Sequence, residues 1–189
     1  MRIVLGVFAF ALFFANDYND WKWARRELKA CFPTGGLLLA AATILGISQG
    51  TAPPHTWVTV FLAVLAGTFL VLLAYTLFFA LPTEASYSRP GEERPVVATG
   101  VYALCRHPGV LWFIALYLCL WGCTGLSLWE TALYSGLNVL LVIFEDRCVF
   151  PGRLAGYAEY CSTTPFLLPN RQSLRACRQT LRGDKDHAV

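Results

Sequence analysis

Charged residues are scarce in this sequence of 189 residues. Only 14% of the residues are Asp, Glu, Lys or Arg and 56% are hydrophobic, against about 25% and about 45–50% in soluble domains. Segments 57–81 and 108–129 carry no charged residue at all. Because lipid offers no partner to backbone polar groups, a helix of about 20 apolar residues is what such a run can form in a bilayer. The composition therefore argues against an ordinary soluble domain and predicts an integral membrane protein.

Several chemical signatures are missing as well. The seven cysteines form no Cys-x-x-Cys motif and have no Cys/His spacing typical of a metal site. The chain also has no phosphate loop, no Gly-rich dinucleotide fingerprint and no internal repeat. We therefore expect no metal, and we interpret all seven cysteines as structural or incidental.

Hydrophobic runs predict an all-α, polytopic membrane helix bundle that forms one domain over residues 1–189. The expected spans are 3–15, 35–50, 56–81, 108–122 and 127–144, and segment 145–189 follows them. The first run is short, but Phe13 and Ala15 make a poor signal-peptide cleavage site, so a retained span is favoured. Ser127 and Glu130 have the spacing of a capping box, which predicts a helix start there.

Basic residues are distributed unevenly between the loops. If the spans alternate, segments 16–34, 82–107 and 145–189 share one side, and these hold 14 of the 15 Lys and Arg residues. Only Arg2 lies elsewhere, and the opposite loops 51–55 and 123–126 hold none. The positive-inside rule then predicts a multi-pass protein with its amino terminus outside. Segment 16–34, rich in aromatic and basic residues, is expected to be a loop on the membrane surface.

Ionisable residues gather around the fourth and fifth predicted spans. Arg106 and His107 precede the fourth, whereas Glu145 and Asp146 follow the fifth. A helical hairpin brings the start of its first helix beside the end of its second, so these four side chains should lie close together. Ionisable groups at the membrane boundary indicate a functional site. Simpler interpretations are also open: Arg106 as an anchor for lipid phosphates, His107-Pro108 as a helix start, and the acids as the end of a span.

The ordered set of motifs resembles one family. It consists of Gly100-x-Tyr102-x-x-x-Arg106-His107-Pro108, a hairpin, an acidic pair, Tyr157-x-x-Tyr160 and Pro165-Phe-Leu-Leu-Pro169, with the two tyrosines 12 and 15 positions after Glu145. This pattern, over about residues 99–169, is similar to the isoprenylcysteine carboxyl methyltransferase and phospholipid methyltransferase superfamily.

The resemblance implies a site for S-adenosylmethionine that faces the cytosol, and a lipophilic acceptor that arrives from the bilayer. Glu145 would hold the amino group of the cofactor, and Arg106 would lie nearest the reaction, so these two are the expected catalytic residues. The expected cofactor-binding residues are Tyr102, Arg106, His107, Pro108, Glu145, Asp146, Tyr157, Tyr160, Pro165 and Leu167.

The chemistry of methyl transfer is compatible with these residue types. A carboxylate can pair with the ammonium of the cofactor, and an arginine can form a two-pronged contact with its carboxylate. The acceptor could be an isoprenylcysteine-like carboxylate, a phospholipid amine, or a small hydrophobic thiol or acid. An amine would first have to lose a proton, which His107 or Glu145 could take.

The chain also departs from the family pattern. Its second acid is Asp146, Val110 and Trp112 replace a Tyr and a Gly, Leu154-Ala155-Gly156 precedes Tyr157, and Pro151-Gly152 interrupts the following helix. Two alternatives therefore stay open: a sterol-reductase-like enzyme that binds NADPH, and a non-enzymatic lipid-binding or small transport protein. The sequence does not identify the acceptor or the oligomeric state.

The carboxy-terminal segment carries arginines at helical spacing. Arg171, Arg175, Arg178 and Arg182 recur beside Leu174, Cys177 and Leu181. This pattern predicts a short amphipathic helix on anionic membrane lipid rather than a nucleic-acid site. Residues 184–189 are expected to fray, and His55 is expected to be a solvated loop residue.

Overall fold

The structure is a computed structural model that describes residues 1–51, 53–54, 56–80 and 94–181. His55, Arg182 and segment 184–189 lie outside the described residues. The described chain is mostly helical, with seven α-helices. These are α1 (Arg2–Lys22), α2 (Cys31–Ser48), α3 (Trp57–Phe78), α5 (Pro108–Cys123), α6 (Leu128–Phe144), α7 (Tyr157–Thr163) and α8 (Arg171–Leu181).

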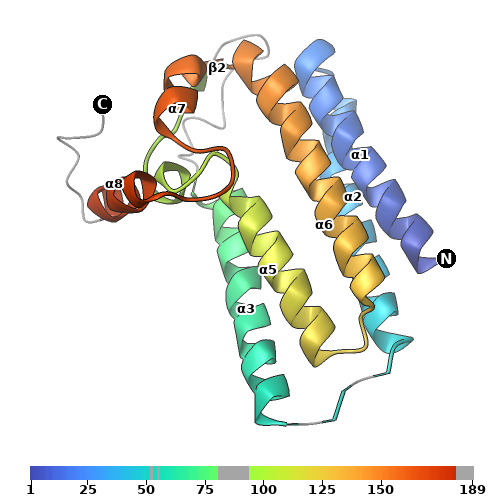
Figure 1. Ribbon diagram of the computed structural model, residues 1–189. Helices are drawn as coiled ribbons and strands as arrows, with labels where there is room; N and C mark the ends of the chain where they lie inside the picture. Colours follow the sequence, from blue (N-terminus) through green and yellow to red (C-terminus); the bar gives the residue numbers. More distant parts are fainter. Residues whose placement is uncertain (52, 55, 81–93, 182–189) are drawn as a thin grey trace.

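Five helices form a bundle in which the chain runs up and down (Figure 1). The connections from α2 to α3 and from α5 to α6 lie at the end that also holds the amino terminus. The start of α5, the end of α6, α7 and the short strand β2 lie at the other end. This second end, called here the site end, carries the ionisable residues singled out in the sequence.

Local sequence signals explain where the helices begin. Ser127 caps α6: its hydroxyl accepts the backbone N–H of Glu130 at 3.2 Å and donates to the Glu130 carboxylate at 2.9 Å, which confirms the predicted capping box. Thr56 and Thr59 form a similar pair at the start of α3. Pro108 is the first residue of α5. A backbone N–H at this position has no partner within the helix, so its absence costs no hydrogen bond.

The predicted loop 16–34 is wrong in its extent, because α1 continues to Lys22 and a 3-10 turn, η1 (Glu27–Ala30), leads directly into α2. The end of α1 is fixed by Asn19, whose amide exchanges two hydrogen bonds with the backbone of Arg25 at 3.0 Å each. Ala24 takes a left-handed conformation with φ of 51°, so the chain reverses there.

Two helical segments, Glu27–Ser48 and Trp57–Phe78, are long and apolar enough to cross a membrane, and α5 is apolar but shorter. They correspond to the second and third predicted spans. Helix α3 exposes large apolar side chains along its length, such as Trp57, Val71 and Phe78, which are 81%, 67% and 66% exposed. A helix that is apolar on every side does not suit water when its faces remain uncovered.

The interior of the bundle is aromatic, and an ion pair lies near the end opposite the site end. Phe10 of α1 packs edge-on against Phe113 of α5 and beside Tyr134 of α6. Glu130 is fully buried, and its carboxylate lies 2.7 Å from Nε of Arg2. The ion pair and the aromatic contacts join α1 to α6.

Candidate functional site

The loop before α5 meets the end of α6 at the site end, and the contact is an ion pair. Nε and Nη2 of Arg106 donate to the two carboxylate oxygens of Asp146, at 2.8 and 3.0 Å. The Arg106 and Asp146 side chains are only 12% and 15% exposed. This two-pronged geometry is the strongest arrangement available to an arginine and a carboxylate, and it confirms that the hairpin brings these residues together.

Arg106 also holds the carboxy-terminal segment. Its Nη1 donates to the carbonyl oxygens of Thr164 at 2.9 Å and Cys161 at 3.4 Å. Its backbone N–H donates to the carbonyl oxygen of Pro165 at 2.9 Å. All three guanidinium nitrogens are thus engaged within the chain, and Arg106 fastens the segment after α7 to the hairpin.

His107 lies between the two acids. Its Nε2 is 3.3 Å from Oδ1 of Asp146, and its Nδ1 is 3.6 Å from Oε2 of Glu145. The ring stacks on Phe150 at 5.6 Å and meets the edge of Phe166 at 5.2 Å between centroids. Burial lowers the pKa of His107 to about 4, more than the neighbouring Asp146 raises it. The imidazole is therefore neutral at pH 7.

The predicted tyrosines belong to the same cluster. Tyr157 donates to Oδ1 of Asp146 at 2.5 Å, and Tyr160 donates to the carbonyl oxygen of Tyr102 at 2.6 Å. Tyr102 in turn donates to the carbonyl oxygen of Thr76 in α3 at 3.1 Å. Burial raises the pKa of Tyr102 to about 12 and that of the other two tyrosines as well. All three are uncharged donors that join α7, the loop before α5 and α3.

The two acids lie on a π-helical turn, η3 (Glu145–Val149), which continues α6, and they have different partners. Such turns are frequent at functional sites because they redirect side chains. Burial opposes ionisation of Asp146, but the hydrogen bonds from Arg106 and Tyr157 outweigh it and hold its pKa below the usual value. Asp146 is therefore an ionised carboxylate that organises the site.

Glu145 also lies close to Asp17 of α1, so the two carboxyl groups influence each other. Two buried carboxyl groups at close range favour a proton on one of them. Burial and the neighbouring Asp17 raise the pKa of Glu145 well above its usual value, and burial raises the pKa of Asp17 to about 6. Asp17 is a site residue that the sequence analysis missed. Its only signal was an acid just beyond the first apolar run.

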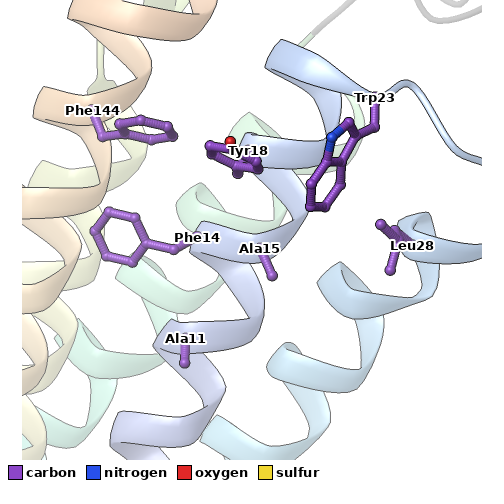
Figure 2. Close-up of a pocket in the computed structure, with 7 residues that line it drawn as sticks. All are labelled: Ala11, Phe14, Ala15, Tyr18, Trp23, Leu28 and Phe144. Carbon is purple, nitrogen blue, oxygen red and sulfur yellow. The ribbon is translucent and has the colours of Figure 1, made fainter.

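An apolar hollow of about 450 Å³ lies between α1, η1 and the end of α6 (Figure 2). Tyr18, which follows Asp17, and Phe144, which precedes Glu145, are part of its wall. The rings of Phe14 and Phe144 lie 5.9 Å apart between centroids, and Figure 2 shows both, with Tyr18, among the lining side chains. The full lining is Ala11, Phe14, Ala15, Tyr18, Trp23, Leu28 and Phe144. The volume is in the range of small-molecule sites, and no pattern in the sequence predicted it.

The remaining predicted residues and the departures have clear places. Pro108 is buried at the start of α5, and Leu167 is half-buried in the segment after α7. Trp112 donates from Nε1 to the hydroxyl of Thr76 at 3.2 Å, and Val110 is buried in α5. Pro151 lies in a 3-10 turn, η4 (Phe150–Gly152), which ends the helix.

After η4 the chain forms a short strand, β2 (Leu154–Ala155), beside β1 (Arg94–Pro95). The two strands pair in parallel, with Arg94 opposite Leu154. Gly156 then takes a left-handed conformation with φ of 78° and begins α7. The strand pair therefore sets where α7 starts, and so where Tyr157 and Tyr160 can reach.

The ionisable groups allow a test of the expected cofactor. The acid pair offers oxygens to an ammonium, and Arg106 does not compete for them, because it is bound to Asp146. A cofactor carboxylate does not find a free guanidinium nitrogen on Arg106 in this conformation. The fit is therefore good for the amino group and incomplete for the carboxylate.

Among the described residues, no group of three or more His, Cys, Asp or Glu side chains is arranged to hold a metal ion. The seven cysteines are all unpaired thiols. Comparison of the chain with protein-family models, with curated proteins and with solved structures gives no match.

Proposed function

We propose that this chain is an integral membrane methyltransferase that moves a methyl group from S-adenosylmethionine to a lipophilic acceptor. The observation that carries the proposal is the convergence of Arg106, His107, Glu145, Asp146 and Tyr157, from three separate segments, into one polar cluster at the end of apolar helices. These are the residues on which the family resemblance rests.

The membrane part of the proposal is supported by the outer surface of the bundle. Its apolar side chains, those of α3 above all, remain uncovered, and lipid is the medium that such a surface suits. We propose five spans, made by α1, α2, α3, α5 and α6, with the site end in the cytosol. The loops at that end carry nearly all the basic residues.

We assign Glu145, with Asp17, to the amino group of the cofactor. Burial raises the pKa of both carboxyl groups, and an ammonium would supply the hydrogen-bond donors and the positive charge that this pair lacks. Arg106 acts first as a positioning residue, because it ties Asp146 to the carbonyl oxygens after α7. A role beside the reacting atoms requires Asp146 to release at least one guanidinium nitrogen.

The cofactor supplies an electrophilic methyl group on a sulfonium, and the protein needs no covalent intermediate. Its residues must align the acceptor and exclude water. The apolar hollow between α1 and the end of α6 suits the hydrocarbon part of an acceptor. A carboxylate or thiolate acceptor reacts as it stands, whereas an amine must first lose a proton. His107, with a pKa of about 4, is a weak base for this step, and Glu145, whose pKa is raised, is the better candidate.

The same hollow favours a second candidate, a non-enzymatic lipid-binding protein. Its wall is apolar and made of aromatic and small side chains, so it could hold an acyl chain without any chemistry. The two candidates differ in one respect that can be measured, which is affinity for the cofactor.

The test is calorimetric titration of the detergent-purified protein with S-adenosylmethionine and S-adenosylhomocysteine. We expect micromolar binding that is lost in Glu145→Ala and kept in Glu159→Ala, a matched change on the exposed face of α7. A folded protein that binds neither compound would overturn the methyltransferase proposal and leave lipid binding. Binding that survives Glu145→Ala would overturn the assignment of Glu145.

A further inference from the structure

Helix α8 lies outside the bundle, and Figure 1 shows it running across the direction of α3 and α5 near the site end. Asn170 caps the helix, since its side chain accepts the backbone N–H of Ser173 at 2.8 Å. On the inner face Ser173 is buried, and the hydroxyl of Thr180 accepts the backbone N–H of Gly100 at 3.0 Å. Gly100 begins the 3-10 turn η2 (Gly100–Ala103), so α8 rests on the loop that leads to Arg106.

The outer face of α8 combines two kinds of side chain. Leu174 and Leu181 are 53% and 63% exposed. The arginines at 171, 175 and 178 are exposed between and beside them. At 3.6 residues per turn all five fall within about one third of the helix circumference. No acidic residue occurs in α8 to neutralise the arginines.

This combination narrows the choice of partner. In water the exposed leucines gain no free energy from burial. On an apolar protein surface the arginines would lose their hydration without a partner for their charge. A helix that lies in the plane of a membrane satisfies both, because its leucines reach the acyl boundary while its arginines meet phosphate groups. The position of α8 at the site end, where the apolar helices stop, places this outer face at the level of the headgroups in the proposed orientation.

We propose that the outer face of α8 binds the surface of a bilayer that contains anionic phospholipid, and that this contact holds η2 in place. The inference rests on the proposed membrane location and is independent of the methyltransferase activity. It has a consequence for the candidate site, because η2 contains Tyr102, whose carbonyl oxygen receives the Tyr160 hydroxyl. The charge of the membrane surface would then influence how firmly Tyr102 and Tyr160 are held in the candidate site.

The test is amide hydrogen exchange of the full chain in nanodiscs of phosphatidylcholine alone or with three tenths phosphatidylglycerol. Three arginines, at about fivefold each in equilibrium constant, predict a preference of about 100-fold for the anionic surface. We therefore expect amides of α8 to exchange at least about tenfold more slowly in the anionic discs. High salt should remove most of the difference.

Three variants separate the causes. Replacing the three arginines by glutamine should abolish the difference between the lipids, and replacing them by lysine should keep most of it. The matched control is Gln172→Ala with Gln179→Ala, on exposed positions outside the outer face, which should leave the difference unchanged. Protection of α3 amides in every disc shows that the bundle is intact.

Equal exchange of α8 in the two lipids would overturn the proposal. So would a lipid difference that survives the glutamine variant, because another surface would then be responsible. Loss of cofactor binding has no bearing on either result, so failure here is distinguishable from failure of the proposed function.

Discussion

At the residue scale, Arg106 and Asp146 decide whether the site end holds together. Their pair joins the loop before α5 to η3, and Arg106 reaches further to the carbonyl oxygens of Cys161 and Thr164. Because both side chains are largely buried, the loss of one partner leaves the other desolvated and unpaired. Arg106, which we propose for the cofactor pocket, therefore also has a role in folding.

This gives the first prediction. Asp146→Asn should lower the free energy of unfolding by about 3 kcal/mol, because the buried guanidinium then faces a neutral amide. Thermal unfolding in detergent, followed by tryptophan fluorescence, measures the loss. Glu159→Gln removes an exposed carboxylate from α7 and should change stability by less than about 0.5 kcal/mol. A similar small change for Asp146→Asn would mean that water already screens the pair.

A second prediction concerns the acid pair. The pKa of Asp17 is raised from 3.8 to about 6 in the folded protein, so between these values the folded state binds more protons than the unfolded state. Stability must then fall as pH rises through this window and level off above it. Asp17→Asn removes the titration and keeps a donor for Glu145. The variant should match the wild type near pH 4 and be more stable above pH 6, by about 3 kcal/mol at most.

Urea unfolding at several pH values measures this difference. The lowered pKa of His107 acts in the opposite sense over a similar window, but it is present in both proteins and cancels in the comparison. A difference between the two proteins that does not vary with pH would contradict the raised pKa of Asp17.

At the scale of the elements, the two loops at the end opposite the site end meet backbone to backbone. Gly50, after α2, and Gly125, between α5 and α6, approach so closely that a Cβ on either would overlap the backbone of the other. Gly136, in the middle of α6, has no neighbour within 4 Å of such a Cβ. The same substitution should therefore have opposite effects at two glycines of one hairpin.

Gly125→Ala should lower the free energy of unfolding by about 2 kcal/mol, because the loops must separate. Gly136→Ala should leave it unchanged or raise it by up to about 1 kcal/mol, because alanine is the better helix former. Thermal unfolding of the two variants side by side makes the comparison. Equal melting temperatures would show that the loops can move apart without loss.

Features that depend on neighbours in sequence could be predicted, and those that depend on the packing of helices could not. The capping box at Ser127 and Glu130 is local and was confirmed. The proximity of Arg106 and His107 to the acids follows from the hairpin and was also confirmed. The pairing of Arg106 with Asp146 rather than Glu145, and the π-helical turn that carries both acids, had no signal in the sequence.

The end of α1 and the hollow could not be predicted from the sequence for a related reason. Hydropathy locates the part of α1 that suits lipid, but the helix itself continues to Lys22 because its polar residues remain helical. The proximity of Asp17 to Glu145 and the apolar hollow both arise where α1 packs against the end of α6. Residues so far apart in sequence carry no common pattern.

At the scale of the whole molecule, the one basic residue outside the predicted inner loops is Arg2, and it is paired with the fully buried Glu130. The pair neutralises a charge that would otherwise oppose an external amino terminus. It also fixes the start of α1 beside the start of α6, at the end of the bundle opposite the candidate site. Five crossings with the amino terminus outside are therefore consistent with the distribution of charge.

The last prediction follows from this arrangement. Short epitope tags at the two ends of the full chain, probed with protease in intact cells and in permeabilised cells, should be cut from outside only at the amino terminus. An odd number of spans puts the ends on opposite sides, whereas a chain in which α1 does not cross would protect both tags. Glu130→Gln, which leaves the charge of Arg2 unpaired, should increase the fraction of molecules with a protected amino terminus. Ser127→Ala weakens the same helix start but leaves the Glu130 charge, so it should not change that fraction, and an equal shift in both variants would assign the effect to α6 rather than to the charge of Arg2.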